Sequence, residues 1–313
     1  MKLTNKHNLP QAFVDAVAAR PYIRKSTLSV TEMADPLQKT ILTHRYFDQL
    51  EEDAIDRVWA LLGSAAHEIL ARSTEGAQLV EERLHATFAT SNGYITVSGQ
   101  PDRIDADHRL RDFKITSAWT MVYRSRDIEW ARQLSYYRVL ATIATDLEIQ
   151  DEAEIIAIIR DFNQHQAGQG SYPEFPVCVV PISLLSLEDA YKQMFDYCSQ
   201  YLLHKGSPDK ALPPCSPEDR WTQPDRFAVY KNNTVKRASR VFDSEAEALA
   251  LLTDLQAEMD GKGKAKNPTA YVEQRKGGPR RCEDYCPVSR FCHQHQSELT
   301  MQPAVENPFN NDE

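Results

Sequence analysis

The chain of 313 residues is long enough for about two domains, or for one large domain with an appendage. Hydrophobic residues make up 42% and charged residues 26%, a composition that is typical of folded globular proteins and excludes wholesale disorder or a collagen-like chain. The formal net charge of -9 disfavours a polyanionic partner such as DNA, unless the charge is unevenly distributed.

Membrane and secretory segments are not evident in the sequence. The longest apolar run, 155–159, has the length of a strand, well below the roughly 18 residues that cross a bilayer. The first residues also contain no apolar stretch of the kind that marks a secretory signal. We therefore expect a cytoplasmic protein, in the host cytoplasm if it is phage-encoded, with no membrane partner.

The first half of the chain predicts helices followed by strands. Residues 1–50 indicate an irregular helical lead-in, in which Ser29 offers a hydroxyl cap. Apolar residues recur every three or four positions over 51–72 and predict an amphipathic helix. Strand-like stretches at 78–90, 94–104 and 110–118 are separated by turn residues, so the simplest prediction is an antiparallel meander.

Further elements follow in the second half. Helical spacing over 128–144, apolar runs at 154–162 and 177–182, and a capped helical pattern at 186–203 complete a predicted α/β domain of residues 1–205. Prolines then mark a linker. The rest of 206–313 is predicted to contain a hairpin at 226–242, an acidic helix at 244–259 and a cysteine-rich segment.

The most informative motif lies on two neighbouring predicted strands. Gly-Gln-Pro-Asp ends at Asp102, and Asp112-Phe113-Lys114 follows ten residues later. Asp112 and Lys114 project from one face of a strand, because side chains alternate along it. Asp102 on the adjoining strand can lie opposite Asp112 and give a hard divalent cation its second carboxylate. Taken alone, the motif is also compatible with a surface ion pair.

Two helical signals flank this motif. His67 follows a small-residue turn upstream, and Gln133 and Tyr137 share one helical face downstream. The order G-x-x-x-H, P-D, D-x-K and Q-x-x-x-Y resembles the RecB-like branch of the PD-(D/E)XK nucleases, over roughly residues 27–205. The resemblance implies a mixed sheet flanked by helices, with a C-terminal αβ and cysteine-cluster appendage.

The resemblance also implies roles for these residues. His67, Asp102, Asp112 and the backbone carbonyl of Phe113 would bind Mg²⁺ or Mn²⁺, and Lys114 would position the attacking water and help to deprotonate it. Gln133 and Tyr137 would orient the substrate phosphate or the lysine. In isolation, His67 and Tyr137 would be interpreted as core residues. Glu81 and Glu82 could reach a second metal ion, although solvated strand charges are the simpler interpretation.

Three of the six cysteines cluster near the C-terminus, which in a reducing compartment favours a metal or cluster site over disulfides. Iron-sulfur members of the RecB-like branch, including CRISPR-associated nucleases and AddB subunits, have such a cluster. The match departs from the family in two ways: the first spacing here is C-x3-C, where C-x2-C is usual, and no cysteine precedes the nuclease motifs, where the family has its fourth ligand. Cys215, in a Pro-flanked loop after the core, is the best candidate for that ligand. The ligands predicted for a [4Fe-4S] cluster are therefore Cys215, Cys282, Cys286 and Cys292.

Zinc is the alternative metal for the cysteine site. Cys282, Cys286 and Cys292 with either His293 or His295 would make an ordinary zinc site, because zinc accepts three sulfurs and one nitrogen. The two remaining cysteines, Cys178 and Cys198, are interpreted as buried small hydrophobes.

A basic segment leads into the cysteine site. Residues 262–281 carry a formal charge of +6, which leaves -15 for the rest of the chain. The segment is either a solvated linker or a contact for a DNA backbone, with Tyr271 available to stack on a base. Its basic residues are Lys262, Lys264, Lys266, Arg275, Lys276, Arg280 and Arg281.

The sequence therefore predicts a metal-dependent DNA nuclease. An exonuclease acting on single-stranded DNA or duplex ends, in recombination, repair or phage DNA processing, is the leading hypothesis. A catalytically idle or complex-dependent DNA-binding subunit with a structural zinc site is the alternative. No Walker A motif is present, so a recombination, single-strand-binding or helicase partner would supply any motor.

Overall fold

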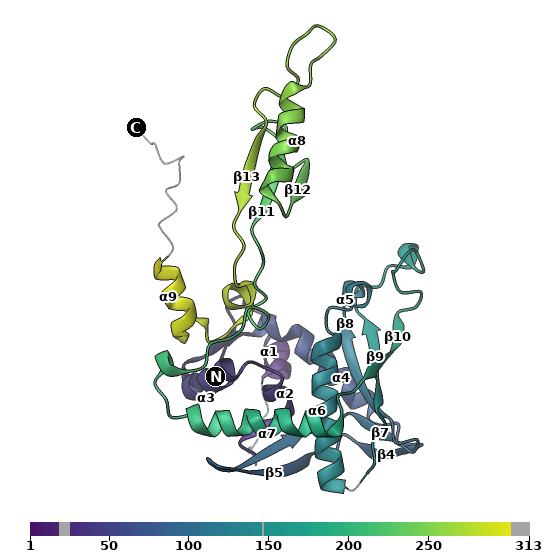
Figure 1. The fold of residues 1–313 in the computed structure, drawn as a ribbon. Helices are drawn as coiled ribbons and strands as arrows, with labels where there is room; N and C mark the ends of the chain where they lie inside the picture. Colours follow the sequence, from purple (N-terminus) through teal and green to yellow (C-terminus); the bar gives the residue numbers. More distant parts are fainter. Residues whose placement is uncertain (19–25, 146, 302–313) are drawn as a thin grey trace. The chain divides into compact units, whose positions relative to one another are not determined.

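The computed structural model describes residues 1–18, 26–145 and 147–301, and the chain divides into two compact units, Met1–Pro213 and Pro214–Glu313 (Figure 1). The division falls in the Pro-containing stretch that the sequence marks as a linker. Each unit is described by itself. Among the described residues, no helix is long and apolar enough to span a membrane.

The N-terminal segment of the first unit is less helical than its sequence predicts. It contains β1 (Lys2–Thr4), α1 (Gln11–Val17), β2 (Leu28–Ser29), α2 (Val30–Met33) and α3 (Leu37–Tyr46). Ser29 does cap a helix, since its hydroxyl accepts a hydrogen bond from the Glu32 amide while the Glu32 carboxylate accepts one from the Ser29 amide.

The helix that carries His67 starts later than predicted. Residues Glu51–Asp53 form β3, which pairs in parallel with β1, and the α-helix proper is α4 (Val58–Leu70). Backbone pairing with the N-terminal strand therefore replaces the first turn that the helical periodicity predicted.

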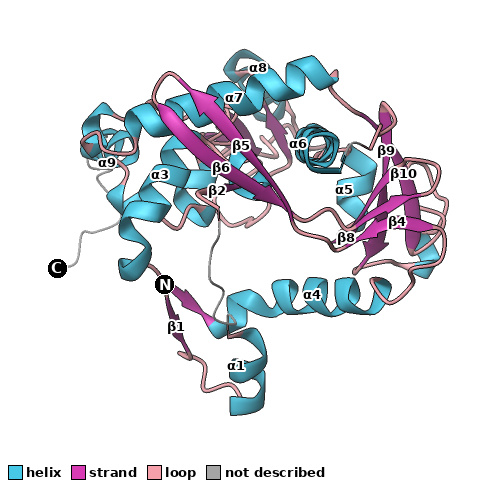
Figure 2. Ribbon diagram, turned by 90° about the horizontal axis from the view of Figure 1, so that it is seen from below, coloured by secondary structure: helices cyan, strands magenta, loops and turns pink. Residues whose placement is uncertain are grey.

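The antiparallel pairings of the predicted meander are present, as β5 with β6 and β7 with β8, but the single sheet is wrong, because these strands belong to two sheets. β4 (Ala77–Val80), β7 (Arg103–Asp105) and β8 (Leu110–Thr116) pair in one sheet. β5 (Leu84–Thr90) and β6 (Gly93–Gly99) pair with each other, and β6 also pairs with β2, in a second sheet. Figure 2 shows β5 and β6 as a separate ribbon from the sheet that contains β4 and β8.

Strand pairing is interrupted at two residues, which explains why these strands form two sheets. Pro101 has no amide hydrogen for a strand ladder, and it falls where β6 ends and β7 has not begun. Glu81, directly after β4, has a left-handed φ of 49°, which few residues other than glycine adopt. The backbone changes sheet at both positions, and the motif residues Gln100 and Asp102 lie at this crossing.

The larger sheet is mixed and positions the candidate site. Its order is β10-β9-β8-β7-β4, with β9 (Glu152–Ile159) parallel to β8 and antiparallel to β10 (Val177–Ser183). Helix α6 (Asp127–Thr145) contacts both sheets, while α7 (Leu187–His204) covers β5 and β6 (Figure 2). The predicted mixed sheet flanked by helices is confirmed.

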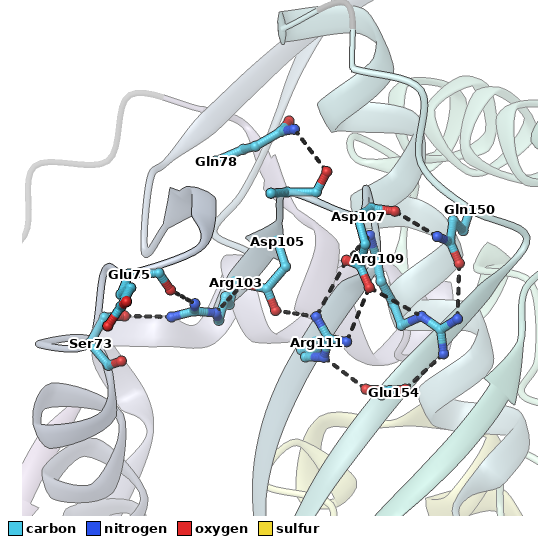
Figure 3. Close-up of polar contacts among 11 residues, drawn as sticks. Ser73, Glu75, Gln78, Arg103, Asp105, Asp107, Arg109, Arg111, Gln150 and Glu154 are labelled. Atoms are coloured by element: carbon cyan, nitrogen blue, oxygen red, sulfur yellow. Dashed lines mark hydrogen bonds and ion pairs between the residues drawn. The ribbon is translucent and has the colours of Figure 1, made fainter.

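A network of charged side chains holds the register of β7, β8 and β9 (Figure 3). Arg103 and Arg111 lie opposite each other on β7 and β8, and both contact Asp105, which offsets their repulsion. Arg111 also bonds Glu154 of β9 at 2.7 Å, and Arg109 bonds the other oxygen of that carboxylate at 2.7 Å. The network flanks the motif strands and fixes which residues oppose each other.

Gly99 is required by close packing. A Cβ atom at this position would lie 2.8 Å from Cδ1 of Leu140 and 2.9 Å from the ring of Tyr137, both on α6. We expect Gly99→Ala to lower the free energy of unfolding by about 1–3 kcal/mol, because neighbouring core side chains must shift. Urea denaturation measures the free energy of unfolding. Gly63→Ala is the control, since a Cβ there meets nothing within 4 Å and alanine should raise helix stability. Equal changes in the free energy of unfolding for the two variants would contradict the packing argument.

The second unit contains a small αβ domain and the cysteine-rich segment. β11 (Arg226–Tyr230) lies between β12 (Arg240–Phe242) and β13 (Tyr271–Arg275), and α8 (Glu245–Ala257) packs on this sheet. Val229, Ala248, Leu255 and Ala270 form its core. The predicted hairpin and acidic helix are present, while β13 was not predicted, because its residues were interpreted as part of a basic linker. The chain then enters a short helical turn at Arg281–Tyr285 and ends in α9 (His293–Met301).

Candidate functional site

Two buried aspartates oppose each other in the larger sheet. Arg103 pairs with Arg111, so the next step of the antiparallel register brings Asp102 opposite Asp112, as predicted. Asp102 and Asp112 are 6% and 2% exposed. Asp102 Oδ2 accepts a hydrogen bond of 2.7 Å from the Phe113 amide, which fixes the carboxylate beside β8.

His67 reaches this pair from α4. Its Nδ1 lies 3.2 Å from Asp102 Oδ1, and its Nε2 lies 3.1 Å from the Phe113 carbonyl oxygen. The imidazole ring also meets the Phe113 ring edge-on, with centroids 6.3 Å apart. The structure thus brings together His67, Asp102 and the Phe113 carbonyl, although they lie far apart in sequence.

Glu81 joins the same cluster, which the interpretation as a solvated strand charge did not anticipate. Its Oε1 lies 3.3 Å from His67 Nδ1, and ligand atoms of His67, Glu81 and Asp102 all lie within 4.8 Å of one another. Its amide donates to the Asp102 carbonyl, while its Oε2 accepts a 2.6 Å hydrogen bond from Gln100. Glu82, in contrast, is exposed. Glu81 could have been found from the strand register. Val80 pairs with Arg103 across β4 and β7, so the next residue, Glu81, lies opposite Asp102.

Lys114 and Asp112 form a buried ion pair at 2.5 Å between Nζ and Oδ2. Burial raises the pKa of Asp112 to about 6, and the Asp102 charge adds to this while Lys114 opposes it. Burial disfavours the Lys114 ammonium, but the adjacent Asp112 carboxylate outweighs it and the pKa of Lys114 is raised. The Asp112 carboxylate thus favours the charged form of Lys114, while the role of Lys114 as a base next to bound cations stays a prediction.

The histidine is also held in its charged form. Its hydrogen bond to Asp102 raises the pKa of His67 to about 9; burial opposes this rise, and Glu81 and Asp112 support it. The same negative charge that raises the pKa of His67 would also favour a bound cation.

The donor set fits a hard divalent cation. Mg²⁺ and Mn²⁺ prefer carboxylate and carbonyl oxygens, and Mn²⁺ also accepts imidazole nitrogen. The buried Oδ2 atom of Asp112 contacts Lys114 but accepts no hydrogen bond of ordinary geometry among the described residues. This oxygen is therefore available to coordinate a metal ion. A surface hollow of about 640 Å³ gives access from the side of His67, Glu81 and Gln100.

Gln133 and Tyr137 lie next to this centre on α6. Gln133 Nε2 donates a hydrogen bond of 3.1 Å to the Tyr137 hydroxyl, as their i and i+4 spacing predicts. Burial and the charge of Asp112 raise the pKa of Tyr137, so its hydroxyl remains protonated and able to donate.

The donor chemistry therefore defines a centre of the kind found in metal-dependent hydrolases of phosphate esters. The family model of the PD-(D/E)XK nuclease superfamily matches residues 7–293, and the chain belongs to that superfamily. PD-(D/E)XK nucleases use divalent metal ions to cleave nucleic acids, so metal binding and DNA binding follow for this chain as properties of its class.

Solved structures provide one further comparison. The chain is similar to the structure titled "Crystal structure of SSO0001", with 13% sequence identity and a TM-score of 0.41, over 64% of this chain and 90% of that chain. No curated protein matches the chain.

Within the second unit, the four predicted cluster cysteines are close neighbours. No disulfide joins any of the six cysteines, all of which lie in the described residues. Burial, together with the nearby thiols of Cys292, Cys282 and Cys286, raises the pKa of Cys215 to about 12. The Gln294 side chain holds the Cys215 loop, because its amide accepts from the Cys215 N–H at 2.9 Å and donates to the Cys215 carbonyl at 3.1 Å.

The two histidines of the zinc alternative differ in their surroundings. His293 is exposed, whereas His295 is 6% exposed and its buried Nδ1 has no hydrogen-bond partner among the described residues. Of the two remaining cysteines, Cys198 is fully buried, as expected, but Cys178 is half-buried on β10.

The basic segment is not one continuous loop. Residues 271–275 form β13, and several of its cations bond acidic or aromatic neighbours. Lys266 pairs with Glu258, Lys276 with Asp225 and Arg280 with Asp284. Arg275 bonds the Tyr230 hydroxyl, and the Arg281 guanidinium lies 5.2 Å from the centre of the Trp221 ring. No side-chain partner is recorded for Lys262 and Lys264 within the described ranges.

Proposed function

We propose that this protein is a metal-dependent DNA exonuclease of the RecB-like type, acting in recombination, repair or phage DNA processing in the cytoplasm. The convergence of His67, Asp102, Asp112 and Lys114, in the spatial arrangement that their motif order implies, carries the proposal. A structural role alone does not require three buried or half-buried charged groups around one backbone carbonyl, because burying charge is costly.

Each residue has a distinct task in this proposal. His67, Asp102, Asp112 and the Phe113 carbonyl hold Mg²⁺ or Mn²⁺, which would activate water and neutralise charge on the scissile phosphate. Lys114 contributes a positive charge and a proton donor next to Asp112. Gln133 and Tyr137 hold the lysine or the substrate phosphate in place.

Glu81 is proposed as a further support of the metal site. Glu81→Gln removes one charge from the donor group of His67, Glu81 and Asp102 while keeping its shape, so we expect Mn²⁺ affinity to fall by about tenfold to 100-fold, the range seen when residues that orient metal ligands are lost. Isothermal titration with Mn²⁺ measures the affinity. Glu82→Gln is the matched control, and equal affinities for the two variants would exclude Glu81 from the site.

Comparing linear with covalently closed circular DNA as substrates tests whether the enzyme is an exonuclease. An exonuclease degrades linear single-stranded or duplex DNA but spares covalently closed circles of the same sequence. We expect linear DNA to be consumed progressively from an end while circular DNA survives. Nicking or linearisation of the circles at comparable rates would show an endonuclease instead.

For the second unit we propose a [4Fe-4S] cluster on Cys215, Cys282, Cys286 and Cys292. Three cysteines after the core are typical of the iron-sulfur RecB-like branch, whereas Cys215 takes the place of a fourth ligand that the branch has upstream of the core. The effect of the other three thiols on the pKa of Cys215 supports this assignment, because it requires that they lie near it. The unpaired Nδ1 of buried His295 favours the zinc alternative, with a structural zinc site in a DNA-binding subunit that needs a recombination or helicase partner. The basic residues of 262–281 are proposed to contact the DNA backbone in either case.

A further inference from the structure

Lys114 also lines a second pocket. It has a volume of about 180 Å³. Its lining includes Lys114, Arg126 and Arg160, the hydroxyls of Ser117 and Thr120, and Trp130. No carboxylate is among its lining residues. Pockets for drug-sized ligands measure roughly 300–1,000 Å³, so this one suits a smaller polar group.

The charges of the pocket select an anion. Lys114 supplies an ammonium whose partner, Asp112, faces the metal-ligand side. Arg160 follows the end of β9, and its guanidinium lies 4.2 Å from the centre of the Trp59 ring, which holds it without neutralising it. Arg126 contacts Glu129 at 3.3 Å, and both side chains are half exposed, so this pair is easily exchanged for a stronger anion. Guanidinium groups bind phosphate with two parallel hydrogen bonds.

Exposed aromatic side chains lie on the helix that borders the pocket. Trp119 and Tyr123 of α5 (Ala118–Tyr123) are 51% and 70% exposed, and their rings stack with centroids 5.8 Å apart. The same helix provides Thr120 to the pocket, and Ser117 caps it. Aromatic faces next to a cationic groove are the usual arrangement for binding single-stranded nucleic acid, whose bases are free to stack.

We propose that this pocket binds a phosphate group of single-stranded DNA adjacent to the bond that is cut, and that Trp119 and Tyr123 stack on the neighbouring bases. The inference rests on the proposed nuclease function, and it adds the preferred strand form. Lys114 then stands between two subsites, the metal centre on the side of Asp112 and a phosphate subsite on the side of Arg126 and Arg160.

Binding of a fluorescent single-stranded oligonucleotide to the full chain, in EDTA so that no hydrolysis occurs, tests the phosphate contact. Arg126→Gln and Arg160→Gln should each weaken binding and reduce the slope of log affinity against log salt by about 0.7, the value for one phosphate contact on a single strand. Arg124→Gln is the matched control, because Arg124 is an equally exposed arginine that pairs with Asp127 and does not line the pocket.

The stacking contact has its own pair of variants. Tyr123→Ala should lower single-strand affinity about tenfold and leave duplex affinity nearly unchanged, since one base stack supplies an effect of this order. Tyr94→Ala is the control, because Tyr94 is 81% exposed on β6 and distant in topology from α5. Circular dichroism confirms that each variant is folded.

The outcomes separate this inference from the proposed function. Unchanged salt slopes for the arginine variants, or equal losses for Tyr123→Ala and Tyr94→Ala, overturn the inference even if the wild type degrades DNA. Oligonucleotides with a 5′-phosphate, a 3′-phosphate or neither identify which phosphate is bound. Tighter binding of one phosphorylated end shows that the pocket holds a terminal phosphate. Equal binding of all three, weakened by the arginine substitutions, shows that it holds an internal phosphodiester.

Discussion

Lys114→Ala is expected to reduce Mg²⁺-dependent DNA hydrolysis by about 10²–10⁴-fold, the usual range for loss of a positioned proton-transfer group. Lys114 is the cation that contacts buried Asp112, and it also lines the phosphate-sized pocket. Initial rates on end-labelled DNA measure the effect. Lys192→Ala, at an exposed position of α7, is the control and should match the wild type.

Asp112→Asn extends this test to the metal site. The substitution keeps the size of the side chain but removes the charge that stabilises the Lys114 ammonium, so both activity and Mn²⁺ affinity should fall. Activity within about twofold of the wild type in either variant, with a native circular dichroism spectrum, would contradict the assignment of this centre.

Loss of the cysteine site should have the largest effect on stability. Anaerobically purified protein should be brown, with broad absorption near roughly 400 nm, as thiolate-ligated iron-sulfur clusters are. Cys215→Ser or Cys286→Ser should bleach it and leave the second unit open to proteolysis, because binding energies of structural metal sites reach about 10 kcal/mol. Cys178→Ser, on β10 of the first unit, is the control.

Two results would contradict the cluster. Colourless protein with one equivalent of zinc would establish the zinc alternative, and His295→Ala would then be expected to release the metal. Protein with neither iron nor zinc, and with a protease-resistant second unit, would show that the four thiols have no metal ligand role.

The candidate site was more predictable from sequence than the sheet that carries it. Asp102, Asp112, Lys114 and His67 are chemically distinctive and keep a fixed order, so their convergence could be expected. The meander was predicted with the right antiparallel neighbours but as one sheet, because the alternation of apolar residues on either side of Pro101 is the same whether the strands share one sheet or two. Local patterns specify which residues are strands, whereas pairing partners depend on tertiary contacts.

Glu81 shows the same limit at the level of one residue. Its sequence context, two glutamates after a short strand, is typical of a solvated edge. Only its left-handed backbone and its place opposite Asp102 turn its carboxylate toward His67. In the basic segment, local sequence misled in the opposite direction. Its glycines suggested an irregular linker, whereas residues 271–275 form a strand that pairs with β11.

Degradation of end-labelled linear DNA by the wild-type protein, with Mg²⁺ or Mn²⁺ and in parallel with EDTA, tests the central claim most directly. We expect both metals to support hydrolysis and EDTA to abolish it, with single-stranded DNA consumed faster than duplex. Intact DNA in every metal condition, with protein that binds Mn²⁺ and is folded, would contradict the claim that this chain is itself a nuclease.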